Sequence, residues 1–179
     1  MTTVTSMLRE TVARHGDQPA ARFKRGGSWV DMSWREVSDT ARRVAGGVVA
    51  RGVEAGARLG VASNTRVEWI LADLGVLMAG CTTVPIYQSS TADDVAYIIN
   101  DAEIQGLFVE DEVQINKLLE IREETPAVKF LVYFDAPSAE VLEAAGDWIV
   151  SWEDFMASGV AYIEENQTSV DERCRCGAR

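Results

Sequence analysis

The central part of the chain alternates short apolar runs with stretches in which apolar residues recur every three or four positions. The run at residues 58–62 is typical of a strand buried on both faces, and residues 67–78 have the spacing of an amphipathic helix. Gly80 is expected to end that helix before a second strand at residues 82–86. These elements predict a strand–helix–strand unit around which the rest of the chain is organised.

The start and the buried face of this helix can also be predicted. Ser63 or Asn64 is expected to cap it, because a short polar side chain accepts the free N–H groups of a first helical turn. The inward face is expected to carry Val67, Ile70, Leu71, Leu74, Leu77 and Met78.

The segments before this unit predict a helix, a hairpin and a second helix. A hairpin is expected between residues 20 and 32, with its turn at Lys24-Arg25-Gly26-Gly27. Ser33 and Glu36 have the spacing of a capping box, and the helix that they open should end near Gly52. The first helix, at residues 3–13, is expected to turn Val4, Met7, Leu8 and Val12 inward.

The second half continues the alternation with a period of about 23 residues. Strands are expected at residues 106–110, 129–134 and 147–150, with a helix after the first, a loop or short helix around residues 139–145 after the second, and a last helix from Ser151. The predicted fold class is therefore α/β: a layered, mostly parallel sheet with helices on both faces, preceded by an N-terminal helix and a β-hairpin. Residues 1–165 are expected to form a domain, and residues 166–179 a polar, disordered tail.

Charge and composition exclude several classes of protein. The net charge is −11, and residues 90–179 alone carry −14 while residues 1–89 carry +3. Nucleic-acid binding is not expected, because phosphate contacts need positive charge. No transmembrane segment is expected, since the weakly charged stretch at residues 69–87 contains Asp73 and Pro85. Residues 1–11 lack the pattern of a secretion signal, so a cytoplasmic location is expected.

Composition and spacing assign no catalytic, cofactor-binding or metal-binding residue. The chain contains no Gly-x-x-x-x-Gly-Lys-Ser/Thr, no Gly-x-Gly-x-x-Gly after a strand and no Gly-x-Ser-x-Gly. Cys81 is expected to be a small buried side chain, and a metal site at Cys174 and Cys176 would lack ligands because His15 is the only histidine.

Three residues near predicted strand ends are candidate ligand-facing residues: Asn64, Tyr87 and Gln88. Open α/β sheets bind ligands at the carboxyl ends of their strands. The alternative interpretation is structural: Asn64 caps a helix, and Tyr87 packs with its hydroxyl in water.

Several segments resemble a known family. Asn64-Thr-Arg-Val-Glu-Trp-Ile, the Val-Pro-Ile-Tyr at residues 84–87 and the Ser-Ser-Thr-Ala-Asp-Asp that begins at residue 89 are similar to the opening region of AMP-forming acyl-CoA synthetases. The similarity runs from about residue 5 to residue 170 and is closest to the long-chain fatty-acid–CoA ligases.

The resemblance implies a partial N-terminal domain of an adenylate-forming enzyme. Full-length members use ATP, Mg and coenzyme A to convert a fatty acid into acyl-adenylate and then acyl-CoA. The family's phosphate loop should follow the region around Asp171, where this sequence has none, so no catalytic residue is carried over and the chain is expected to be inactive alone.

Three hypotheses about the function of this chain remain. The chain is a truncated segment of a ligase, or a non-enzymatic module that docks on a ligase or on itself, or an unrelated nucleotide-binding domain. A homo-oligomer, a marginally stable monomer, or association with the remainder of a ligase is expected, because an isolated piece exposes apolar strand edges and helix faces.

Overall fold

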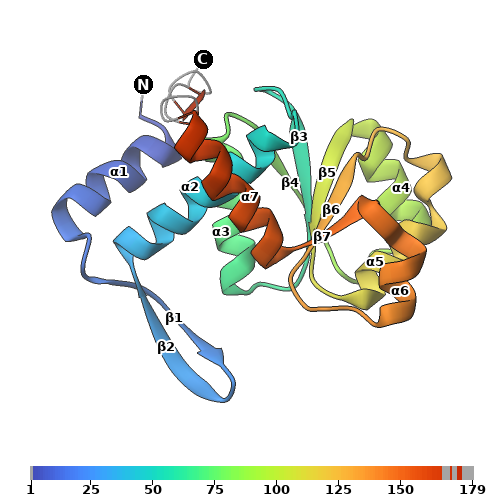
Figure 1. Cartoon of the computed structure of the whole chain (residues 1–179), viewed down its shortest axis with the longest axis horizontal. Coiled ribbons are helices and arrows are strands. Elements are labelled where there is room, and N and C mark those ends of the chain that lie inside the picture. The colour runs from blue at the N-terminus through green and yellow to red at the C-terminus, as the bar shows by residue number, and fades with distance from the viewer. Residues whose placement is uncertain (1, 167–169, 171–172, 175–179) are drawn as a thin grey trace.

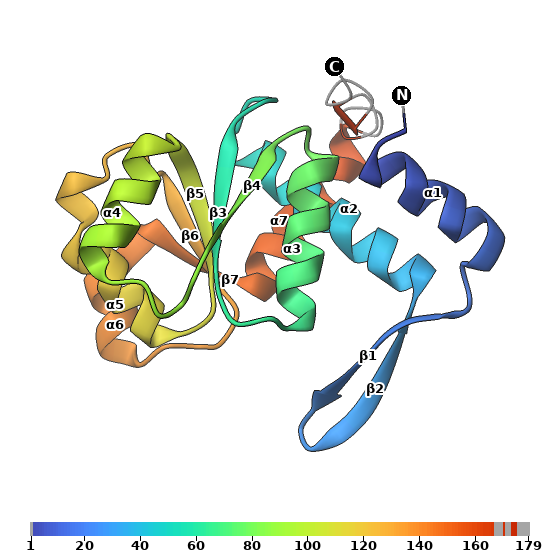
Figure 2. The same ribbon diagram turned by 180° about the vertical axis from the view of Figure 1, so that it is seen from behind.

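In the computed structural model a five-stranded parallel sheet divides the helices into two layers (Figures 1 and 2). The structure describes residues 2–166, 170, 173 and 174. The spatial order of the strands is β4-β3-β5-β6-β7, and every neighbouring pair is parallel. The strands are β3 (Arg58–Ala62), β4 (Thr82–Ile86), β5 (Ile104–Val109), β6 (Phe130–Tyr133) and β7 (Ile149–Ser151).

Helices cover both faces of this sheet, as the pattern predicted. One face packs against α2 (Trp34–Ala50), α3 (Val67–Met78) and α7 (Trp152–Glu165). The other packs against α4 (Ala92–Asp101), α5 (Glu112–Glu120) and α6 (Ala139–Ala145). Along β5 the side chains alternate, since Phe108 belongs to the first core while Leu107 and Val109 belong to the second. Short 3₁₀ turns follow α5 at Arg122–Glu124 and α6 at Gly146–Trp148.

The N-terminal elements lie to one side of the sheet. Helix α1 (Val4–His15) packs against α2 and α3. The antiparallel hairpin of β1 (Pro19–Arg25) and β2 (Ser28–Ser33) projects from the amino end of α2 (Figure 1). The expected capping box at Ser33 and Glu36 is present, because each side chain accepts the other's backbone N–H. The predicted fold class, including the preceding helix and hairpin, is confirmed.

Small residues let α2 and α7 approach closely. A Cβ added at Gly159 would overlap the carbonyl oxygen of Arg43 in α2, and one added at Gly47 would lie 2.7 Å from the ring of Phe155. This contact fixes the C-terminal helix against the domain, and Phe155 is completely buried beneath it.

Several local predictions are wrong. Helix α3 begins at Val67 with Arg66 as its N-cap, and no side chain caps it, so neither Ser63 nor Asn64 has the expected role. Ile70 is exposed, because the buried face is turned toward the small residues Ala72 and Gly75. Val4 and Met7 of α1 are also exposed, since α1 has only a few neighbours on that side.

Strand boundaries differ from the predicted ones by one or two residues, since strand β5 starts earlier and β7 is preceded by the 3₁₀ turn. Most of the tail expected at residues 166–179 lies outside the described residues.

Candidate functional site

The strand order creates a switch point between β3 and β5. The chain leaves β3 toward α3 on one face of the sheet and leaves β5 toward α5 on the other. Connections that diverge in this way open a crevice at the carboxyl ends of the strands, where open α/β sheets bind ligands. Polar and charged residues follow four neighbouring strands at this edge: Asn64 and Arg66 after β3, Gln88 after β4, Glu110 after β5 and Asp135 after β6.

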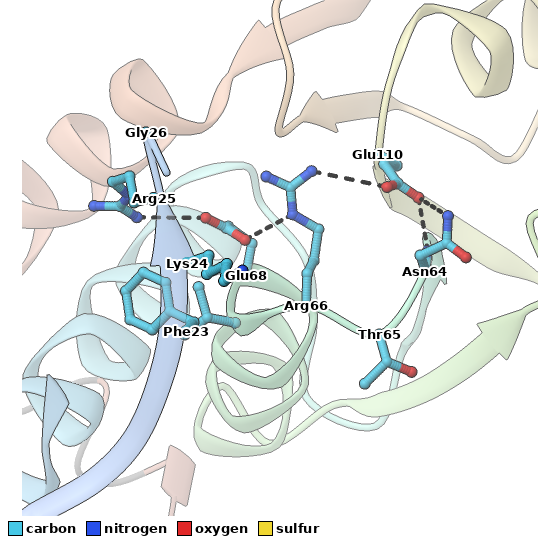
Figure 3. A pocket seen from close by; sticks show the side chains of 10 residues that line it. Phe23, Lys24, Arg25, Gly26, Asn64, Thr65, Arg66, Glu68 and Glu110 are labelled. Atoms are coloured by element: carbon cyan, nitrogen blue, oxygen red, sulfur yellow. Dashed lines mark hydrogen bonds and ion pairs between the residues drawn. The ribbon is translucent and has the colours of Figure 1, made fainter. Parts of the chain in front are cut away.

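Arg66 joins three carboxylates at this edge, Asp135, Glu68 and Glu110, of which Figure 3 shows the last two. Its Nη1 and Nη2 atoms donate to both oxygens of Asp135 at 2.7 and 3.0 Å, and its Nε donates to Glu68 at 2.7 Å. A longer ion pair of 3.9 Å connects Arg66 to Glu110. Glu68 also accepts a hydrogen bond of 3.4 Å from Arg25, which ties the hairpin to the start of α3.

The network is partly shielded from water. The side chains of Glu68 and Glu110 are 13% and 17% exposed, that of Arg66 is 27% exposed, and that of Asp135 is 55% exposed. Hydrogen bonds from Arg66 to Asp135 raise the pKa of the guanidinium above its usual value, burial acts in the opposite direction, and Glu68 raises it further. Arg66 is therefore a permanent cation that offsets part of the negative charge of the carboxylates around it.

Asn64 links this network to the loop after β4. Its backbone N–H and its Nδ2 both donate to Glu110 Oε2, at 2.7 and 3.0 Å. Its Oδ1 accepts a hydrogen bond of 2.9 Å from Gln88 Nε2. The main-chain carbonyl of Gln88 in turn accepts from Gln114 and Lys117 of α5. The loop after β4 is therefore held from both sides.

Two cavities adjoin Asn64. The first, of about 540 Å³, lies between the hairpin and the end of β3, and Lys24, Arg25, Arg66, Glu68 and Glu110 are among its lining residues (Figure 3). The second, of about 290 Å³, lies at the ends of β3 and β4. It carries no charged side chain and is lined by Ser63, Asn64, Thr65, Trp69, Pro85, Ile86, Tyr87, Gln88 and Ser89.

The structure brings the three candidate residues together around the second cavity. Asn64 and Gln88 are hydrogen-bonded to each other, and Tyr87 is 84% exposed beside them. The alternative structural interpretation is wrong for both residues that it concerned: Asn64 caps no helix, and the Tyr87 ring is not packed into the protein. A ligand role for the three residues stays a prediction.

The described residues do not fit a metal ion. No group of three His, Cys, Asp or Glu side chains in the described ranges is arranged to hold one. The carboxylates at the strand ends accept hydrogen bonds from Arg66 and Asn64 instead. No step that uses Mg is assigned to these residues.

Sequence reasoning missed the charged part of the site. Arg66, Glu68, Glu110 and Asp135 were not candidates, although Glu110 directly follows β5, Asp135 is the second residue after β6 and Arg66 directly precedes α3. A charged residue just after a buried parallel strand is the signal that could have found Glu110 and Asp135.

These features define a doubly wound α/β domain with a polar site at the carboxyl ends of its parallel strands. The sequence model of the family described as "AMP-binding enzyme" matches residues 8–172. The chain therefore belongs to the AMP-binding enzyme family, which confirms the resemblance seen in the sequence. Within the part of the chain that the structure describes, no helix is both long and apolar enough to cross a bilayer.

Curated relatives include long-chain fatty-acid–CoA ligases. The chain is 31% identical over 160 residues to the ligase ACSBG2 of Rattus norvegicus, which covers 89% of this chain and 23% of the relative. It is 34% identical over 120 residues to the ligase FadD15 of Mycobacterium bovis, which covers 67% of this chain and 18% of the relative. The chain thus spans about a fifth of the length of these relatives.

Solved structures share the fold. The anthranilate CoA ligase AuaEII, in complex with anthranoyl-AMP, superposes with a TM-score of 0.75 at 19% identity, over 87% of this chain and 28% of that one. The A domain of a carboxylic acid reductase from Segniliparus rugosus, in complex with AMP and a co-purified carboxylic acid, superposes with a TM-score of 0.75 at 18% identity, over 89% of this chain and 30% of that one.

Proposed function

We propose that residues 1–165 are the first part of the N-terminal domain of an ATP-dependent long-chain fatty-acid–CoA ligase. The observation that carries the proposal is the 31% identity to such a ligase over 160 residues. The whole protein would use ATP, Mg and coenzyme A to form acyl-adenylate and then acyl-CoA, and it would work in the cytoplasm.

The 179-residue chain would not make acyl-adenylate by itself. It contains no Gly-rich phosphate loop, and the cation at its strand ends, Arg66, is already paired with Glu68 and Asp135. A phosphate group needs backbone N–H donors and cations that are not already engaged in ion pairs. The segment would instead provide part of the scaffold on which later sequence completes the site.

Exchange of pyrophosphate into ATP, driven by a long-chain fatty acid, tests this proposal. The 179-residue chain should give no exchange above background. A chimera in which residues 1–165 replace the matching segment of a curated relative should restore it. Exchange by the chain alone would refute its incompleteness, and a folded but silent chimera would refute its assignment to this enzyme.

We also propose that Asn64, Tyr87 and Gln88 face a substrate in the whole protein. All three line the uncharged cavity at the ends of β3 and β4, and the Tyr87 side chain is 84% exposed there. An uncharged lining favours an uncharged part of a ligand, because a buried charge without a partner is unfavourable.

Gln88→Ala in the chimera tests this site. The expected result is a raised KM for one substrate with little change in melting temperature. Gln105→Ala is the matched control, because Gln105 lies in β5 near its amino end and its side chain accepts a hydrogen bond from the exposed Lys129. Equal effects of the two substitutions would contradict a ligand role for Gln88.

A second function, a self-association or docking module, is supported by exposed aromatic side chains. Tyr87, Tyr97 and Trp29 are all largely exposed, and β4 is an edge strand. The chain would then form a homo-oligomer, or bind the remainder of a ligase. Light scattering that shows a monomer at every concentration, unchanged by the rest of a ligase, would refute this.

A further inference from the structure

Two cysteines distant in the sequence converge on one small cavity. Cys81 precedes β4, and Cys174 belongs to the last described segment of the chain. Both line a cavity of about 110 Å³, together with Gly80, Leu77 and the start of α1. Cys81 is buried in the first hydrophobic core, Cys174 packs against that core, and neither is in a disulfide.

The backbone around the two cysteines is also close. An added Cβ at Gly80, the residue before Cys81, would lie 3.2 Å from the carbonyl oxygen of Arg173, the residue before Cys174. The Arg173 side chain donates to the carbonyl of Val53, and the Cys81 thiol donates to the carbonyl of the next residue, Glu54. The residues that precede the two cysteines are thus neighbours, and Cys81 and Cys174 follow them in adjacent parts of the backbone.

We propose that Cys81 and Cys174 are an oxidative modification site that closes to a disulfide in the presence of a peroxide. Cys174 is only half-buried, so its thiolate attacks hydrogen peroxide first, which yields a sulfenic acid and releases hydroxide. The Cys81 thiolate then attacks the sulfenic sulfur, and a second hydroxide leaves. Two thiols are oxidised by two electrons, and the peroxide is reduced to two waters.

The environment of Cys81 makes it the slower partner. Burial raises the pKa of its thiol to about 11, and the positive charge of Arg173 opposes this rise. A buried thiol of this kind is inert toward oxidant in solution but can react with a sulfenic acid delivered next to it. The disulfide would fasten the segment around Cys174 to the start of β4.

Peptide mapping after oxidation tests the proposal. The 179-residue chain is treated with hydrogen peroxide, blocked with N-ethylmaleimide in denaturant and digested with trypsin. Trypsin cleaves after Arg173 and Arg175, so Cys174 and Cys176 fall on separate peptides. The expected product is a dithiothreitol-sensitive link between the Cys81 and Cys174 peptides within one chain.

Two variants control the assignment. Cys174→Ser should abolish the link and leave Cys81 open to alkylation, whereas Cys176→Ser should retain it. Oxidation should raise the melting temperature of Cys176→Ser, because this variant can still form the Cys81–Cys174 disulfide, which closes a long loop. The melting temperature of Cys174→Ser should stay unchanged. Full alkylation of Cys81 after oxidation, or a link between Cys174 and Cys176 as the main product, would overturn the proposal.

Discussion

Arg66 offers the sharpest test of the network at the strand ends. Arg66→Met keeps the aliphatic stem but removes the cation that bridges Asp135, Glu68 and Glu110. The pair with Asp135 is about half exposed, and a pair of this kind contributes about 0.5–1 kcal/mol. Glu68 is mostly buried, and leaving such a group without its main partner costs about 1–3 kcal/mol.

The two contributions add to about 1.5–4 kcal/mol, and the remaining bond from Arg25 to Glu68 compensates in part, so a destabilisation of about 2 kcal/mol is expected. For a chain of this length about 2 kcal/mol lowers the melting temperature by about 4–8 °C. Urea denaturation should show a lower midpoint with an unchanged slope, since the surface exposed on unfolding stays the same.

A double-mutant cycle separates the partners of Arg66. Asp135→Asn alone should cost less than Arg66→Met, and the coupling energy between the two should fall below about 1 kcal/mol, because Asp135 is half exposed. Arg66→Lys should recover only part of the loss, since an ammonium cannot hold Asp135 by two parallel bonds. A change in the free energy of unfolding of less than about 0.5 kcal/mol for Arg66→Met, the range of an ordinary surface substitution, would refute a structural role for this network.

Three further substitutions test the scaffold. Gly159→Ala should gain about 1 kcal/mol of stability from helix propensity but lose about 3 kcal/mol, because the new methyl overlaps the backbone of Arg43. A melting temperature at or above that of the wild type would contradict the close contact between α2 and α7. Trp148→Phe should cost about 1–2 kcal/mol in urea denaturation, because the buried indole N–H donates to a main-chain carbonyl that would lose its partner; an unchanged midpoint would argue against that bond. Hydrogen bonds from the Ser33 backbone N–H, and then from its hydroxyl, lower the pKa of Glu36. Glu36→Ala should therefore be destabilising at neutral pH and indistinguishable from wild type once the pH falls well below the ordinary pKa of 4.5. The opposite pH trend in melting curves would refute the capping box.

Much of the fold follows from local pattern. The strand β3 and the capping box at Ser33 were predictable because each depends on residues within a few positions of one another. The cap expected at Ser63 or Asn64 failed because α3 begins only after Arg66, and the Asn64 Oδ1 that would accept helix N–H groups instead accepts from Gln88 Nε2, which is 24 residues away. A short-range rule cannot anticipate a stronger partner that arrives from another strand.

The candidate site divides in the same way. The rule that ligands bind at strand ends predicted the position of Asn64, Tyr87 and Gln88, and the three do line one cavity. The Arg66 network was not predictable, since Asp135 is 69 residues from Arg66 and only the strand order makes them neighbours.

By itself the amino-acid sequence determined the alternation of strands and helices, the α/β class and membership of a family, because hydrophobic period and short motifs are local properties. The tertiary structure alone decided which charges meet at the switch point and that Cys81 lies beside Cys174. The physical reason is that the order of parallel strands is set by crossover connections, which place residues far apart in the chain at one edge of the sheet.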